Sequence, residues 1–216
     1  MATTVKHAQG PVSVKLRAAD YDDSEDWVEF VRGLEDAGAQ WLCLHPRTAG
    51  QKRKGKADYS HFQMLRDVVQ VPVIGNGDIQ TAQDAMGLLR QKTCDMVMVG
   101  RALTARPWML WQVGEALGWS APEGRSGAAP RTPLEEGAEY GQSLLRLLEL
   151  METMFPERLA LNKFRFHLRI SHVWLPFGHN LCSRASMAHS FADMRSMLKA
   201  FFNGSVTMRQ TTDLRQ

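Results

Sequence analysis

The stretch "VPVIGNGDIQ" (71–80) joins a short apolar run to two glycines and a short polar pair. Its first four residues have the composition of a buried strand, and Gly75, Asn76, Gly77 and Asp78 follow where that strand would end. Glycines at the end of a parallel strand leave backbone N–H groups uncovered, and such groups near a helix N-terminus can hold a phosphate. Because Gly-Asn-Gly is also ordinary turn chemistry, the stretch alone fits a phosphate loop and a plain turn equally well.

Three further apolar runs resemble this strand. They are "PVSVKLR" (11–17), "WLCLHPR" (41–47) and "MVMVGRA" (96–102). The four runs start about 24 to 31 residues apart, the length of a βα unit. Helical patterns lie between them: Gly38 can end the first helix, and Thr81 and Asp84 have the spacing of a capping box. The repeat predicts an α/β fold with a parallel sheet.

Four βα units amount to half of an eight-stranded barrel, and we expect residues 1–118 to form such a half TIM barrel. Residues 119–133, rich in Gly, Pro and Ser, have the composition of a linker. We expect residues 134–202 to form a small all-helical domain and residues 203–216 a polar tail. Because a half barrel exposes two sheet edges and an apolar face, either the chain is a piece of a longer protein, which we favour, or a partner closes the barrel.

Composition narrows the class of protein. The chain has 216 residues and a net charge of only +3, so binding of nucleic acid would depend on local clusters of cations. Its three cysteines lack metal-ligand spacing and are an odd number, which favours a reducing compartment over a disulfide framework. The N-terminus lacks the apolar core of a signal peptide, and no apolar run approaches the length of a membrane helix. We therefore expect a cytoplasmic protein without a metal site or a membrane partner.

Polar side chains gather at the predicted strand ends, where barrel enzymes place their active sites. Gly100 and Arg101 end the fourth run one unit after "GNGD", as expected if the last two strands of a barrel hold a phosphate. Lys15 and His45 alternate onto the inward face of their strands, where we expect them in one layer beside an electron-rich ring. In the alternative interpretation, Lys15 pairs with a core carboxylate and His45 is a hydrogen-bonded structural residue.

Two clusters of cations indicate RNA as a partner. The loop "RTAGQKRKGKAD" has five cations before its first carboxylate, namely Arg47, Lys52, Arg53, Lys54 and Lys56. No Asp or Glu occurs from residue 158 to 192, and Arg165, Arg169 and His172 share one side of a predicted helix. Each cluster fits an ordinary solvated surface, and each also fits contact with RNA phosphates beside an active site.

In order and spacing, "PVSVKLR", "LHPRTAGQKRKGKADY", "VPVIGNGDI" and "CDMVMVGRALTARPWM" resemble the second half of the flavin-binding barrel of the tRNA-dihydrouridine synthases. The likeness covers residues 5–112 well, and the helical segment more loosely resembles the tRNA-binding domain of that family. It implies an α/β fold made of the C-terminal half of a TIM (β/α)8 barrel followed by a small all-helical domain. It also implies FMN as cofactor, NADPH as electron donor, tRNA rather than DNA as partner, and reduction of uridine to 5,6-dihydrouridine.

The resemblance further implies roles for individual residues. Those near the flavin ring or ribityl chain would be Lys15 and His45. Those around the FMN phosphate would be Asn76, Gly77, Asp78, Gly100 and Arg101. Arg47 would lie toward the substrate, and the residues that contact tRNA would be Arg47, Lys54, Arg165 and Arg169.

The chain also departs from the family pattern. The first four βα units have no counterpart, and with them goes the cysteine that protonates uracil C5 as general acid. Cys43, Cys94 and Cys182 do not match that cysteine by motif, so we assign no catalytic residue and expect this chain alone to be inactive. Two alternatives stay open: a non-catalytic RNA-binding module derived from the same fold, and another phosphate-binding barrel enzyme.

Overall fold

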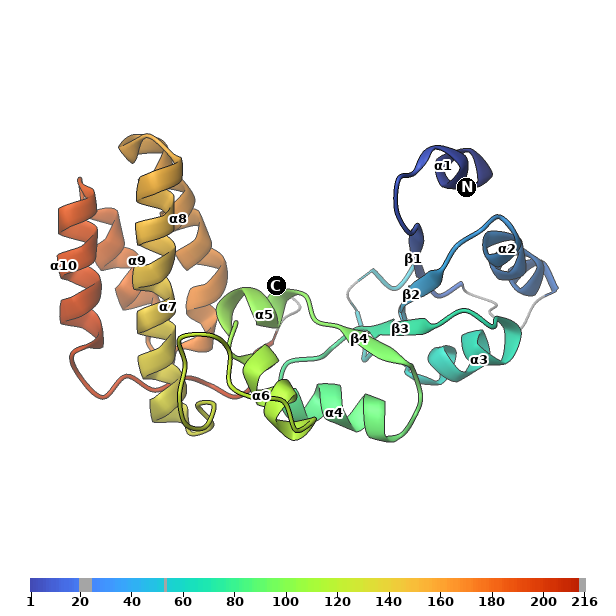
Figure 1. The fold of residues 1–216 in the computed structure, drawn as a ribbon. Helices are drawn as coiled ribbons and strands as arrows, with labels where there is room; N and C mark the ends of the chain where they lie inside the picture. The colour runs from blue at the N-terminus through green and yellow to red at the C-terminus, as the bar shows by residue number, and fades with distance from the viewer. Residues whose placement is uncertain (20–24, 53, 214–216) are drawn as a thin grey trace. The chain divides into compact units, whose positions relative to one another are not determined.

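The computed structural model describes residues 1–19, 25–52 and 54–213, which form two compact units, Met1–Gly100 and Arg101–Asp213. The first unit alternates helices and strands (Figure 1). Its elements are α1 (Ala2–His7), β1 (Ser13–Arg17), α2 (Glu25–Asp36), β2 (Trp41–His45), α3 (Ser60–Val68), β3 (Val73–Asn76), α4 (Ala82–Arg90) and β4 (Met96–Met98).

The four strands form one sheet in the order β1-β2-β3-β4, and every neighbouring pair is parallel. All four predicted strands are present, and the predicted α/β class with a parallel sheet is confirmed. In the register, Lys15 lies opposite Cys43 and Arg17 lies opposite His45. The C-terminal strand ends therefore lie along one edge of the sheet, as a repeated βα unit requires.

The two faces of the sheet differ in cover. On one face Leu42, Leu44 and Val73 are fully buried. The opposite face carries every second residue, including Lys15, which is exposed, and Met96 and Met98, which are 44% and 37% exposed. Because side chains alternate along a strand, Lys15 and His45, the residues predicted to face inward, both lie on this open face.

Local signals in the first unit are confirmed. Thr81 accepts a hydrogen bond from the backbone N–H of Asp84, whose side chain accepts one back from the N–H of Thr81, which completes the predicted capping box of α4. Gly38, just beyond α2, has a φ of 94°, a conformation that favours glycine.

The second unit contains only helices among its described residues. They are α5 (Arg101–Ala105), α6 (Met109–Ala116), α7 (Pro133–Met154), α8 (Glu157–Ser171), the 3-10 turn η1 (His172–Trp174), α9 (Gly178–Ser186) and α10 (Phe191–Phe202). Helix α7 packs against α8 and α10, and α8 packs against α9, with Leu144, Leu148, Phe164 and Leu168 in the core (Figure 1).

The division between the units differs from the expected boundary in the linker. Helices α5 and α6 belong to the second unit, because Arg106, Trp108 and Gln112 all donate hydrogen bonds to the buried carboxylate of Glu136 on α7. The expected linker is also tied down, since the N–H of Ala129 donates to Glu115. No helix in the described part of the chain is both long and apolar enough to span a membrane.

Candidate functional site

The two glycines of "GNGD" make room for neighbouring side chains. A Cβ on Gly75 would lie 2.8 Å from both the Phe62 ring and the Cys94 sulfur. A Cβ on Gly77 would lie 2.9 Å from the ring of Tyr59. Distances below 3 Å are too short for carbon contacts, so both positions require glycine for packing against α3 and the residues just before it. Tyr59 follows the basic run "GKAD", and no local pattern in the sequence marks it as the packing partner of Gly77.

The polar pair of "GNGD" is also engaged within the protein. The Asn76 side-chain amide donates to the backbone oxygen of Met98 at 2.8 Å, which ties β3 to β4. Asp78 accepts two hydrogen bonds from Arg47, at 2.7 and 2.6 Å, and a third from the N–H of Ala57 at 3.1 Å. The Asp78 carboxylate is thus neutralised by an arginine instead of being available to repel a phosphate.

Arg47 lies inside the first unit. It is 3% exposed, and besides Asp78 its guanidinium donates to the backbone oxygen of Gly55 at 2.7 Å. The resemblance to the family implies that Arg47 lies toward the substrate tRNA and Asp78 beside the cofactor. In the structure the two side chains bind each other. The reason is a contact between residues 31 positions apart, which no local pattern reveals.

Lys15 and His45 lie on the open face of the sheet. In the register, His45 pairs with Arg17 and Lys15 pairs with Cys43, and the expectation that Lys15 and His45 share one layer stays a prediction. Burial, and to a lesser extent the charges of Arg17, Lys15 and Arg47, together lower the pKa of His45 to about 4, while the charge of Asp78 opposes them. The imidazole is therefore neutral near pH 7, and its buried Nδ1 has no hydrogen-bond partner among the described residues.

Gly100 and Arg101 straddle the boundary between the units. Gly100 follows β4 and is exposed, and a Cβ there would meet nothing within 4 Å. Packing therefore does not require glycine at this position, in contrast to Gly75 and Gly77. Arg101 is exposed and begins α5 in the second unit.

The basic loop keeps its lysines at the surface. Lys52, Lys54 and Lys56 are exposed, whereas Arg53 lies outside the described residues. Arg17 Nη1 donates to the backbone oxygens of Thr48 at 3.0 Å and Lys52 at 3.1 Å. The loop backbone is thus held from β1 while its ammonium groups face solvent.

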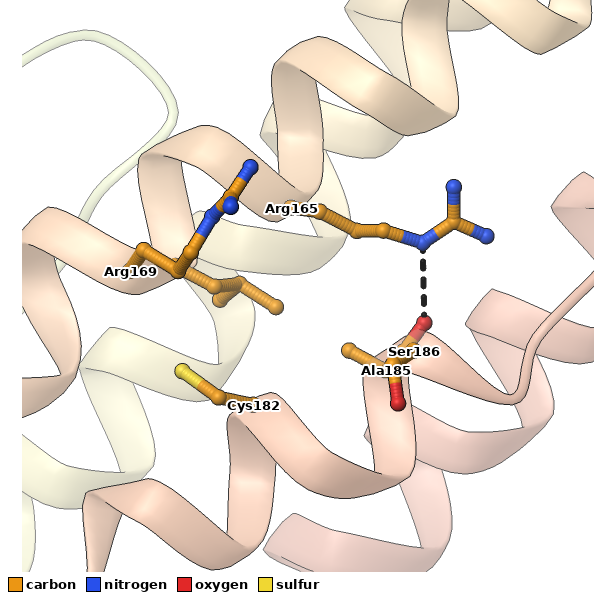
Figure 2. A pocket seen from close by; sticks show the side chains of 6 residues that line it. Arg165, Arg169, Cys182, Ala185 and Ser186 are labelled. Carbon is orange, nitrogen blue, oxygen red and sulfur yellow. Dashed lines mark hydrogen bonds between the residues drawn. The ribbon is translucent and has the colours of Figure 1, made fainter.

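The cations of α8 do not act as one group. Arg165 Nε donates to the backbone oxygen of Ala185, and its Nη2 donates to that of Ala188, so this side chain caps the end of α9 (Figure 2). Arg169 is exposed, and its side chain runs in a different direction from that of Arg165 (Figure 2); both line a cavity of about 200 Å³ together with Cys182. His172 begins η1 directly after α8, and its Nδ1 lies 2.9 Å from the oxygen of Arg169 at the end of that helix. Arg169 is the member of the predicted stripe best placed for an external phosphate.

The dihydrouridine synthase family model matches residues 1–176. A "Probable tRNA-dihydrouridine synthase" of Mycobacterium leprae is 31% identical over 202 residues, which cover 92% of this chain and 50% of that protein. A protein of the same description from Rhizobium leguminosarum bv. phaseoli is 39% identical over 105 residues, 49% of this chain and 33% of the relative. A "tRNA-dihydrouridine synthase B" of Xanthomonas campestris pv. campestris is 34% identical over 121 residues, 56% of this chain and 36% of the relative.

The chain spans half or less of the length of these curated relatives. The family match, in contrast, covers most of the chain, from the first helix to beyond the 3-10 turn. It includes the parallel sheet, the basic loop and α8. The chain belongs to the dihydrouridine synthase family.

Proposed function

We propose that this chain carries the flavin- and RNA-binding parts of an FMN-dependent tRNA-dihydrouridine synthase, which reduces uridine in tRNA to 5,6-dihydrouridine with NADPH. The observation that carries the proposal is the open face at the strand ends, where Lys15 lies near a neutral His45 whose Nδ1 is buried and lacks a partner in the described part of the chain. An unsatisfied buried polar atom is costly, and a ligand that bonds to it removes that cost.

The side chains on the open face of the sheet are chemically suited to bind FMN. A reduced flavin ring and a phosphate are both anionic, and Lys15, Arg17 and His45 supply donors on the open face without a free carboxylate beside them, because Asp78 is held by Arg47. Gly100 is uncovered and is not needed for packing, as expected where a ligand approaches the backbone. We assign Lys15 and His45 to the ring and Asn76, Gly77 and Gly100 to the phosphate side. A bound flavin would supply hydride transfer to the uracil.

The proton that completes the reduction needs a separate donor. Cys43 is buried in β2 with its sulfur 3.6 Å from that of Met98, and burial raises the pKa of its thiol. Cys94 is also buried, and Cys182 lies in the second unit. None of the three is at a strand end, and we propose that this chain alone does not turn over uridine.

RNA binding is assigned to Lys52, Lys54 and Lys56 of the loop and to Arg169 of α8, because these side chains are exposed. A non-catalytic RNA-binding module would keep the same cations, and the burial of Cys43 and Cys94 away from any proton-donating position favours it as the second candidate. The two functions differ in the flavin: the enzyme requires it and the module does not.

The test combines two titrations of the full chain. FMN binding, followed by quenching of flavin fluorescence, should weaken about ten- to hundred-fold in Lys15→Ala, the cost of one charge-assisted hydrogen bond. Binding of bulk tRNA at several salt concentrations should show a slope shallower by somewhat under one unit in Lys54→Ala and in Arg169→Ala. Arg146→Ala, which removes an exposed arginine paired with Glu149, is the matched control and should leave both titrations unchanged.

The outcomes separate the candidates. Binding of tRNA without FMN would support the RNA-binding module. Failure to bind either ligand would refute both functions.

A further inference from the structure

We propose that the ion pair of Arg47 and Asp78 positions the described parts of the β2–α3 loop, residues 46–52 and 54–59, so that the exposed lysines there are already in place when RNA arrives. The inference rests on the function proposed above and makes Arg47 and Asp78 positioning residues of the RNA site.

Arg47 and Asp78 each form a hydrogen bond to the backbone of the loop. Arg47 Nη2 donates to the oxygen of Gly55 at 2.7 Å, and Asp78 Oδ2 accepts from the N–H of Ala57 at 3.1 Å. Gly55 and Ala57 flank Lys56, and Gly55 directly follows Lys54. The two side chains are joined by parallel hydrogen bonds of 2.7 and 2.6 Å, a geometry that fixes direction as well as distance. The backbone that carries both lysines is therefore attached to the end of β3.

Packing supports the same attachment. The ring of Tyr59, the last residue of the loop, lies against Gly77 and is stacked on Phe62 of α3, with ring centroids 5.3 Å apart. Gly77 directly precedes Asp78, so the ion pair and the ring contact meet the same short turn. Arg17 holds the first half of the loop separately, through the oxygens of Thr48 and Lys52.

The burial of Arg47 makes the pair more than a surface ion pair. The Arg47 side chain is 4% exposed and that of Asp78 is 33% exposed. Loss of the carboxylate would leave a buried guanidinium without its counter-charge, a strongly unfavourable state that the loop can relieve only by opening. An opened loop would have to be ordered again on binding RNA, and that ordering lowers affinity.

The first experiment measures the loop directly, in the full chain and without RNA. Trypsin cleaves after Lys52, Lys54 and Lys56, and cleavage follows the population of the opened loop. Asp78→Asn should speed cleavage at these sites about ten- to hundred-fold. Asp67→Asn makes the same chemical change at an exposed carboxylate that accepts a hydrogen bond from Gln63, and it should leave the rate unchanged.

Two milder variants distinguish opening of the loop from unfolding of the whole chain. Arg47→Lys keeps the charge but loses the two-pronged geometry, and it should raise the cleavage rate by a smaller factor than Asp78→Asn. Asp78→Glu, which keeps the carboxylate, should restore part of the protection. Equal cleavage rates in wild type and Asp78→Asn, with the far-ultraviolet circular dichroism of both intact, would overturn the inference.

The second experiment couples the pair to RNA. Lys54→Ala should weaken binding of bulk tRNA in the wild-type background but have little effect in the Asp78→Asn background, because the lysine is then no longer held in place.

Two results would count against one proposal or the other. Full additivity of Lys54→Ala and Asp78→Asn refutes the positioning role. Failure of the wild type to bind tRNA refutes the proposed function, and the proteolysis still tests the pair by itself.

Discussion

Replacement of Glu136 by Gln should be the most destabilising conservative change in the second unit. Glu136 is buried on α7, and its carboxylate accepts hydrogen bonds from Arg106, from Trp108 Nε1 at 3.2 Å and from Gln112 Nε2 at 2.9 Å. Arg106 is buried as well, and its Nη1 also donates to the oxygen of Gln210 at 3.0 Å. Glu136→Gln keeps the shape but leaves the guanidinium without its counter-charge.

The expected loss is about 3 to 5 kcal/mol in the free energy of unfolding, the usual cost of removing one partner of a buried ion pair. Urea denaturation followed by circular dichroism at 222 nm measures it. Glu149→Gln is the matched control, because Glu149 and Arg146 form an exposed pair with side chains 52% and 70% accessible. That control should cost less than about 0.5 kcal/mol.

A double variant tests the cause. Arg106→Met with Glu136→Met removes both charges, and it should cost less than the sum of the two single changes, because neither buried charge is then left alone. Recovery should be incomplete, since Trp108 and Gln112 lose their acceptor. A cost below about 1 kcal/mol for Glu136→Gln, or strict additivity in the double variant, would refute this account of the buried pair.

Two further predictions concern the first unit. Gly75→Ala should lower the free energy of unfolding, measured in urea, by about 1 to 3 kcal/mol, because its Cβ would lie 2.8 Å from Phe62 and Cys94. Gly33→Ala in α2 is the control, and it should be neutral or stabilising because a Cβ there meets nothing within 4 Å. The pKa of His45 is about 4 in the folded chain, chiefly because of burial, and about 6.5 in the unfolded chain. The unfolded chain therefore takes up the proton first as pH falls. The free energy of unfolding should decrease by about 1 to 2 kcal/mol between pH 6.5 and pH 4. His45→Gln should flatten this dependence in urea titrations, and an unchanged pH profile in that variant would contradict the assignment.

Much of the fold could be predicted from local patterns. Strand positions, the parallel sheet, the capping box of Thr81 and Asp84 and the end of α2 at Gly38 depend on residues close together in the chain, so composition and spacing reveal them. Lys52, Lys54 and Lys56 of the basic loop are exposed, as a run of cations without carboxylates predicts, whereas Arg47 of the same run is buried.

The roles of individual polar residues depended on tertiary structure. Arg47 and Asp78 bind each other across 31 residues, and Arg165 caps a helix that begins 13 residues later in the chain, at Gly178. Sequence identified these side chains as charged but could not say what each would meet. An arginine that faces a phosphate and one that meets a carboxylate or a carbonyl have the same local sequence pattern, and only the folded chain brings one of those partners within hydrogen-bond distance.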